Sequence, residues 1–262
     1  MIAPMNATLP LERRDLIAAR LAAGEPVSAN ELAAEFDVSE DAIRRDLRAL
    51  AAQGRCRRVY GGALPVSPAT VPMAVRADEG RARKDALARA AAATIQPGEF
   101  VFLDSGSTNL ALARHLPQDS ELTVATNSVD IAAAVLARPD VRLVMIGGVV
   151  DPVVGGCVDA DAVQAVTRMN IDRCFVGACA VSPDGGVSAF DAADAAFKRA
   201  LAAASRERLV LATSDKLGAR APYRVVEVGG IGCFVLEHDA DRRIASALTR
   251  GGASVLKALR PD

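Results

Sequence analysis

The sequence predicts an α/β protein with two domains, a small helical domain that ends in a strand and a larger α/β domain built on a mostly parallel sheet. Three prolines within Pro65–Pro72 forbid helix and favour an extended connection, which divides the chain. Before them, apolar residues recur at helical spacing; after them, strands alternate with helices, as in a parallel sheet covered on both faces. We expect domains over residues 1–64 and 76–262, joined by a Pro-rich linker over 65–75.

The first domain contains two capped helices close together. Ser28 and Glu31 match a capping box, in which each side chain satisfies an unpaired amide, and Ser39 caps the next helix two residues after the first one ends. The predicted elements are helices over Leu11–Ala23, from Ser28 through Phe36 and over Glu40–Gln53, and a short strand over Arg57–Tyr60 before Gly61-Gly62. In the first helix we expect three residues to point inward: Leu16, Ile17 and Leu21. The order helix, helix, turn, helix, wing is that of a winged helix-turn-helix.

The net charge of −1 conceals two segments of opposite sign. Residues 1–43 carry three arginines and eight acidic residues, whereas residues 44–58 carry six arginines and one aspartate. An arginine cluster acts within a Debye length of about 8–10 Å, so the local sign decides what it attracts. Three of these arginines project from the third helix away from its apolar stripe: Arg44, Arg45 and Arg48.

This arrangement suits double-stranded operator DNA. The third helix of such a domain enters the major groove, where arginines reach guanine edges or phosphates, and wing residues contact the backbone or the minor groove. A solvated helix face is the alternative interpretation of a charge run. The candidate DNA contacts are Ser28, Ser39, Arg44, Arg45, Arg48, Arg57, Arg58 and Tyr60.

The second domain contains six predicted strands and six predicted helices. The strands cover Phe100–Leu103, Leu122–Ala125, Val141–Ile146, Cys174–Gly177, Leu209–Leu211 and Cys233–Leu236. The helices cover Arg83–Thr94, Asn109–His115, Ser128–Ala137, Ala160–Thr167, Ala192–Ala204 and Asp241–Leu248. Because ligands of open α/β sheets bind beyond the carboxyl ends of the strands, the loops that follow the strands are the candidate site.

Three of these loops are rich in hydroxyls or glycine, and two lysines follow later in the chain. Free amides at a helix N-terminus and neighbouring hydroxyls bind phosphate, Lys binds it as a point charge, and Asp104 could accept from a sugar hydroxyl. Helix capping, turn formation and a solvated surface are the alternative roles of these residues. The candidate effector contacts are Asp104, Ser105, Gly106, Ser107, Thr108, Thr126, Asn127, Ser128, Gly147, Gly148, Lys198 and Lys216.

Composition excludes several classes of protein. The chain has 262 residues and 51% hydrophobic residues, which excludes disorder, and no stretch approaches the roughly 18–20 consecutive apolar residues of a membrane span. The N-terminus lacks a basic segment followed by an apolar one, so we expect a cytoplasmic protein without a membrane partner. The five cysteines form no CxxC pair, which disfavours disulfides and zinc, and we predict no metal and no cofactor.

The segments Val27–Ala33, Val38–Leu47 and Arg58–Ala63 resemble the winged helix-turn-helix of the DeoR family of bacterial transcriptional regulators. The run Ser39-x-x-x-Ile43-Arg44-Arg45-Asp46-Leu47 is among its most recognisable segments. The loops after the strands resemble the family's sensor domain, a relative of ribose-5-phosphate isomerase and the CoA-transferases. The chain departs from the family at Asp194–Ala196 and at Thr213.

The resemblance implies a sequence-specific operator binder, most often a repressor of sugar or related catabolic genes, with a phosphorylated sugar-like effector. We expect a homo-oligomer, a dimer or a tetramer, in which the effector changes the spacing of two DNA-binding modules. A sugar-phosphate isomerase-like enzyme is the alternative function, with Asp104, Asp194 and Lys198 as candidate catalytic groups. No paired carboxylates and no histidine with an acidic partner stand near the three loops in the sequence, so no catalytic residue is predicted.

Overall fold

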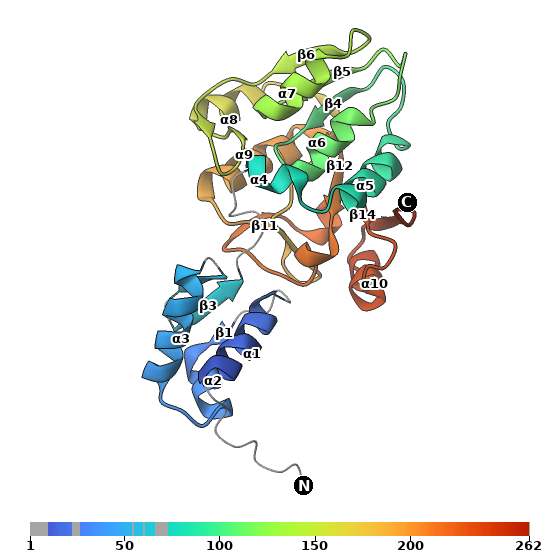
Figure 1. Ribbon diagram of the computed structural model, residues 1–262. Coiled ribbons are helices and arrows are strands. Elements are labelled where there is room, and N and C mark those ends of the chain that lie inside the picture. Colours follow the sequence, from blue (N-terminus) through green and yellow to red (C-terminus); the bar gives the residue numbers. More distant parts are fainter. Residues whose placement is uncertain (1–9, 23–26, 54, 60, 66–72, 262) are drawn as a thin grey trace. The chain divides into compact units, whose positions relative to one another are not determined.

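The computed structural model describes residues 10–22, 27–53, 55–59, 61–65 and 73–261, and the chain divides into two compact units, Met1–Ser67 and Pro68–Asp262 (Figure 1). Most of the predicted linker, residues 66–72, lies outside the described residues. Both ends of the predicted linker range belong to regular structure, since Pro65 ends a strand and Met73 begins a helix. None of the described helices is both long enough and apolar enough to cross a membrane.

The first unit is a three-helix domain with a small antiparallel sheet. Its elements are α1 (Pro10–Ala22), β1 (Val27–Ser28), α2 (Ala29–Glu35), α3 (Glu40–Ala52), β2 (Cys56–Val59) and β3 (Gly62–Pro65). The strands have the order β1-β3-β2, so β2 and β3 form the predicted wing hairpin and β1 adds a third strand. The helices enclose a core that includes Ile17, Leu21, Leu32, Ile43 and Leu47.

Serine side chains cap α2 and α3 as predicted. The Ser28 hydroxyl accepts from the Glu31 amide at 3.5 Å, and the Ser39 hydroxyl accepts from the Ala42 amide at 3.3 Å. The expectation for Leu16 is wrong, because this side chain is 42% exposed. The buried face of α1 instead follows Arg13, Ile17, Ala18 and Leu21, a helical stripe from which Leu16 is displaced.

The second unit is built on a seven-stranded parallel sheet with the order β15-β14-β12-β9-β4-β5-β6. These strands are β4 (Phe100–Leu103), β5 (Thr123–Thr126), β6 (Arg142–Met145), β9 (Ile171–Phe175), β12 (Ser205–Ala212), β14 (Cys233–Leu236) and β15 (Ser254–Lys257). The smaller strands are β7 (Val150–Asp151), β8 (Gly156–Cys157), β10 (Ala180–Ser182), β11 (Gly186–Ala189) and β13 (Tyr223–Val226). The last three of these form an antiparallel sheet with the order β10-β11-β13, and β7 pairs with β8.

Helices cover both faces of the parallel sheet (Figure 1). They are α4 (Met73–Asp78), α5 (Arg81–Ala92), α6 (Ser107–Arg114), α7 (Val129–Leu136), α8 (Ala160–Val166), α9 (Ala192–Ala203) and α10 (Arg242–Arg250), with short 3-10 turns η2 (Ser214–Lys216) and η3 (Val228–Gly230). Successive strand residues face opposite sides, so Val101 and Leu103 pack with α5, α6 and α7, whereas Phe102 packs with α8, α9 and α10.

The strand order places a crevice at the carboxyl edge of the sheet. The chain starts at β4, adds β5 and β6 on one side, and then crosses to β9 on the other side of β4. Crossover helices therefore leave β4 and β9 in opposite directions, and their carboxyl ends form a topological switch point. The Asn109 side-chain amide joins the two ends, because it donates to the backbone oxygens of Asp104 at 2.9 Å and Phe175 at 2.8 Å.

The predicted mixed α/β architecture is confirmed, and some elements were missed. The unpredicted strand β15 lies at the edge of the sheet, where its Ser-Val-Leu-Lys sequence is only half-buried. Strands β10 and β11, which were not predicted, consist of small buried residues on either side of the turn-forming segment Pro183-Asp184-Gly185. Helix α4 was not predicted, and its first three residues, 73–75, were assigned to the linker because they directly follow Pro72.

Candidate functional site

The predicted DNA-reading helix α3 has one apolar and one basic face. Ile43, Leu47 and Leu50 are buried, whereas Arg44, Arg45 and Arg48 are all exposed. The Arg44 guanidinium lies 2.6 Å from Glu40 Oε2, and Arg45 Nε donates to the Asp41 carbonyl oxygen at 3.3 Å. Exposed pairs of this kind contribute little free energy, so the arginines can exchange these partners for phosphates.

The remaining predicted DNA contacts have different surroundings. Ser28 and Ser39 cap α2 and α3, which leaves each hydroxyl able to donate outward while it accepts from an amide. Arg58 on β2 is exposed. Tyr60 and the side chain of Arg57 lie outside what the structure describes.

Asp46, in the middle of the Arg-Arg-Asp-Leu run, is a residue that sequence reasoning missed. It is 3% exposed and lies between two guanidiniums of α1: Arg13 Nε donates at 2.7 Å to one oxygen, and Arg14 Nε donates at 2.9 Å to the other. The signal was its position three residues after Ile43 and beside Leu47, which places it on the buried face. Asp46 thus ties α1 to the helix that carries the exposed arginines.

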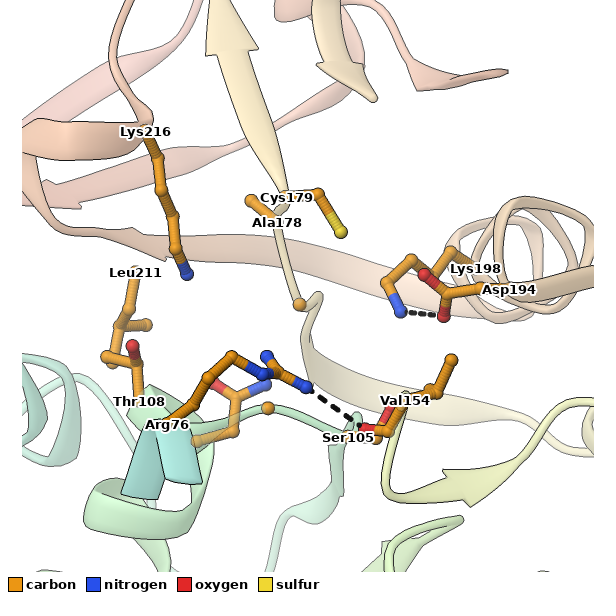
Figure 2. Close-up of a pocket in the computed structure, with 13 residues that line it drawn as sticks. Arg76, Ser105, Thr108, Val154, Ala178, Cys179, Asp194, Lys198, Leu211 and Lys216 are labelled. Atoms are coloured by element: carbon orange, nitrogen blue, oxygen red, sulfur yellow. Dashed lines mark hydrogen bonds and ion pairs between the residues drawn. The ribbon is translucent and has the colours of Figure 1, made fainter. Parts of the chain in front are cut away.

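A pocket with an empty volume of about 450 Å³, a figure that includes space open to solvent, lies at the switch point between β4 and β9. Residues after β4, β9 and β12 converge on it with α4 and α9 (Figure 2). Its lining includes Arg76, Ser105, Gly106, Thr108, Asn109, Gly177, Cys179, Asp194, Lys198 and Lys216. A neighbouring cavity shares Arg76 and Lys216 with it and adds Glu79, Arg83, Lys84, Ser107, Thr213 and Asp215.

The loop from β4 to α6 presents hydrogen-bond donors to the pocket. The first amide bonded within α6 is that of Leu110, which donates to the Gly106 oxygen at 2.9 Å, so the three preceding amides have no acceptor inside the helix. Gly106 has φ +153°, in a region that disfavours side chains. The Thr108 hydroxyl is buried and has no hydrogen-bond partner among the described residues. A buried donor without a partner is costly, which favours a ligand that would satisfy it.

Cations line the pocket beside this loop. Figure 2 shows Lys216 reaching toward Thr108 and the Arg76 guanidinium pointing toward Ser105 and Val154, while Lys198 and Asp194 lie on the far side of the pocket. Burial lowers the pKa of Lys216; Cys179 and Asp215 oppose this shift, and Arg76 and Lys198 add to it. Burial also lowers the pKa of Lys84 in the adjoining cavity to about 8, with a further contribution from Lys216. An anion would relieve this concentration of positive charge.

The other end of the pocket is formed by a buried cluster of three charges. Lys198, 2% exposed, pairs with Asp194 one helical turn before it and lies 3.1 Å from Asp104 Oδ2. Burial lowers the pKa of Lys198, but the two carboxylates raise it more, so it exceeds its ordinary value and the lysine stays charged. Burial raises the pKa of Asp104, against the opposing effects of Lys198 and the Gly177 amide. The cluster carries one excess negative charge when all three groups are ionised.

The predicted effector residues fall into two groups. Ser105, Gly106, Thr108, Lys198 and Lys216 line the pocket, and Ser107 lines the neighbouring cavity. The residues outside both linings are Asp104, Thr126, Asn127, Ser128, Gly147 and Gly148.

Two members of the second group, Asp104 and Asn127, hold the loop between β4 and α6 in place through hydrogen bonds to its backbone. Both oxygens of Asp104 are occupied by backbone amides, Ser105 at 2.8 Å and Gly177 at 2.7 Å. Asn127 accepts from the Ser105 amide at 3.0 Å and donates to the Cys157 oxygen at 3.0 Å. These residues shape the pocket and lie beneath its surface.

Sequence reasoning missed three polar residues that line the pocket. Asn109 was assigned only to a helix, and Arg76 was the first residue of the predicted second domain, where no strand or helix was expected before Arg83. Cys179 follows β9, so its position after a parallel strand was a signal that could have found it. Burial raises the pKa of the Cys179 thiol, which keeps it protonated.

Comparison with known proteins identifies both units. The family model described as the DeoR C terminal sensor domain matches residues 79–238, and that of the DeoR-like helix-turn-helix domain matches residues 13–70. The uncharacterized HTH-type transcriptional regulator YgbI of Escherichia coli (strain K12) is 32% identical over 254 residues, which cover 95% of this chain and 98% of that protein. The glycerol-3-phosphate regulon repressor of the same strain is 32% identical over 206 residues, covering 78% of this chain and 81% of the repressor.

Solved structures give only a distant likeness. The ribose 5-phosphate isomerase from Plasmodium falciparum has a TM-score of 0.39 at 14% identity and covers 53% of this chain and 54% of its own. The two curated relatives are transcriptional regulators, which does not support the isomerase alternative. The chain belongs to the DeoR family of transcriptional regulators, with a helix-turn-helix domain followed by a sensor domain.

Proposed function

We propose that this protein is an operator-binding repressor of sugar or related carbon-catabolism genes, controlled by a phosphorylated sugar-like effector in the pocket at the switch point. It acts as a homo-oligomer, a dimer or a tetramer, in the cytoplasm, where the operator DNA is. Two relatives support the repressor role by their names, the glycerol-3-phosphate regulon repressor and the putative aga operon transcriptional repressor of Escherichia coli O157:H7.

The division of the pocket into two ends is the observation that carries the effector proposal. The free amides of α6, the unpartnered Thr108 hydroxyl and the cations Arg76 and Lys216 suit a phosphate group. At the other end Asp194 is suited to accept from hydroxyls of the sugar portion, and the excess negative charge there disfavours a second anionic group. A phosphomonoester with a polyhydroxylated chain therefore fits better than a bisphosphate.

The DNA proposal is carried by α3. Its exposed arginines are spaced over about one turn, so they can contact base edges and phosphates along one groove. In an oligomer two such helices would reach half-sites about 34–36 Å apart, or a multiple of that distance.

The effector proposal is tested by thermal unfolding with a panel of phosphorylated sugars, their unphosphorylated counterparts and inorganic phosphate. We expect stabilisation of the sensor domain by phosphorylated compounds only, and loss of this stabilisation in Thr108→Val and Lys216→Gln. The exposed Arg220, which lies outside both cavity linings, provides the matched control variant Arg220→Gln. Equal stabilisation by unphosphorylated sugars would contradict the proposal.

The operator proposal is tested by replacing Arg44, Arg45 and Arg48 together by Ala. Each contact to a base is worth about 1–3 kcal/mol, so operator affinity should fall by at least about 100-fold while helical content is unchanged. The slope of affinity against salt should fall as well, because fewer phosphates are neutralised. Replacing the exposed sensor-domain residues Arg220 and Arg224 by Ala should leave both quantities unchanged.

A further inference from the structure

Arg76 lies in the short helix α4, the first element of the sensor domain in chain order. Only residues 66–72 separate α4 from β3, the last strand of the DNA-binding unit. The Arg76 side chain lines both the pocket and the neighbouring cavity, and the residue is 9% exposed. The segment that leads to the DNA-binding unit therefore contributes a buried cation to the pocket.

Helix α4 is held in place by hydrogen bonds to the β7–β8 hairpin and to α5, and by packing of Met73 and Ala77 against α6 and the core. The guanidinium of Arg76 donates from its NH2 group to the Val153 oxygen at 2.8 Å, and Figure 2 shows the second, longer bond to Val154. Lys84 on α5 donates to the Arg76 carbonyl oxygen. A Cβ on Gly155 would lie 2.5 Å from the Met73 Cβ, so Met73 packs directly on the backbone of the same hairpin.

A six-residue helix is not stable by itself, so these contacts decide whether α4 is formed and docked. The Arg76 bonds to the hairpin go to neutral carbonyls, whereas a phosphate in the pocket would offer charged oxygens, which bind guanidinium roughly twice as strongly. Lys216, on the turn after β12, and Thr108, in the first turn of α6, line the same pocket. One anion bound there would therefore bridge three elements, one of which is α4.

We propose that Arg76 couples the pocket to the DNA-binding unit: a phosphate bound between Arg76, Lys216 and the start of α6 tightens the docking of α4, and thereby changes operator affinity. This inference rests on the proposed function, because it assigns the regulation of that site to one residue. Lys216 contributes to binding of the anion but not to this coupling, since its chain segment does not lead to the DNA-binding unit.

The test compares Arg76→Gln with Lys216→Gln by hydrogen exchange of the full chain, with inorganic phosphate as the probe. In the unmodified protein, phosphate should slow exchange at residues 73–78. In Lys216→Gln the same slowing should appear at about tenfold higher phosphate. In Arg76→Gln exchange at 73–78 should be fast without phosphate and unchanged by it, while residues 107–110 of α6 still respond. Unchanged exchange at 73–78 in the unmodified protein, or full slowing in Arg76→Gln, would overturn the proposal.

Operator affinity gives the second measurement. In the unmodified protein, saturating ligand should change the operator dissociation constant by about 5- to 150-fold, the usual range for coupled sites. The ratio of the operator dissociation constants with and without saturating ligand should be retained in Lys216→Gln and should fall to about 1 in Arg76→Gln. Arg76→Lys, which keeps the charge without the planar fork, provides a second variant if Arg76→Gln does not fold, and should retain only part of the ratio. A full ratio in either Arg76 variant overturns the coupling.

The two failures are distinguishable. Stabilisation by phosphorylated compounds without any response of α4 refutes the coupling and leaves the proposed function standing. No stabilisation by phosphate or by any phosphorylated sugar refutes both.

Discussion

Each domain holds one buried charged side chain between two opposite charges, but the two clusters have opposite composition. In the DNA-binding domain the carboxylate of Asp46 lies between two guanidiniums, those of Arg13 and Arg14. In the sensor domain the ammonium of Lys198 lies between two carboxylates, those of Asp104 and Asp194. The first cluster has one excess positive charge and the second one excess negative charge.

The difference lies in what each cluster faces. Asp46 joins α1 to α3 on the side opposite the exposed arginines, so it fixes the position of the helix that carries them. Lys198 and Asp194 line a pocket, so their charges also act on whatever enters it. The same physical device, a buried ion triad, is therefore structural in one domain and part of a site in the other.

The largest effect is expected for Asp46→Ala. This change leaves Arg13 nearly buried without its carboxylate, and breaking a buried pair costs about 3–5 kcal/mol. The unfolding transition of the DNA-binding domain should fall by that amount in denaturant titration, while the sensor transition stays in place. Asp41→Ala, an exposed acid on the same helix, should change neither transition; an equal loss there would remove the distinction between the buried and the exposed carboxylate.

A somewhat smaller effect is expected for Lys198→Met, about 3 kcal/mol in the stability of the sensor domain at neutral pH. The cost is limited because Asp104, whose pKa burial already raises, can take up a proton when the ammonium is removed. If the pKa of Asp104 is higher in the folded than in the unfolded state, its ionisation destabilises the fold at pH values above the folded-state pKa. The stability of Lys198→Met should therefore rise as the pH falls through that pKa. A variant with the same loss at pH 5 and pH 8 would show that no proton is taken up.

Ligand binding should separate the two ends of the pocket. Lys216→Gln removes a cation that lines both cavities, and should weaken a phosphorylated ligand by about 10- to 100-fold. Asp194→Asn should instead weaken the phosphorylated sugar while leaving inorganic phosphate unaffected. Calorimetric titration of both variants with both ligands measures this, and a parallel loss for both ligands in Asp194→Asn would remove the division into two ends.

The smallest expected effect is a pH dependence of ligand affinity. Burial and Lys216 lower the pKa of Lys84 to about 8, so its charge is lost as the pH rises from 7 to 9. The attraction for an anion in the adjoining cavities should weaken over this range by a few-fold, roughly 1 kcal/mol at most. In Lys84→Met the affinity should be lower and its pH profile flatter, as measured by titration at fixed ionic strength.

Several features of this protein could be predicted from sequence because they depend on local patterns. Capping serines, helical apolar stripes and alternating strands and helices depend on neighbours within one or two turns, so α2, α3, β4 and β14 lie where they were expected. The carboxyl edge of the sheet was also predictable, because parallel strands place their following loops on one side. The same rule explains why three of the predicted effector contacts, Ser105, Gly106 and Thr108, line the pocket, while their contact with an effector stays a prediction.

The roles within those loops depended on contacts distant in sequence. Nothing local distinguishes Asp104, whose oxygens are occupied by amides, from Asp194, which lines the pocket. One Asp104 oxygen accepts from the adjacent Ser105 amide, but the other accepts from the amide of Gly177, 73 residues along the chain. Thr126 and Ser128 look as favourable as Thr108 in the sequence, yet only Thr108 lines the pocket.

The sequence by itself determined the two-domain order, the arginine-bearing helix and the edge at which a ligand would bind, because helix and strand periodicity and local charge are properties of adjacent residues. Tertiary structure alone decided that Asp46 forms ion pairs with α1, that the charged Lys198 pairs with two carboxylates, and that Arg76 lines the pocket. The physical reason is that burial and charge pairing depend on which distant segments the strand order β9-β4-β5 brings together, and no local pattern records that order.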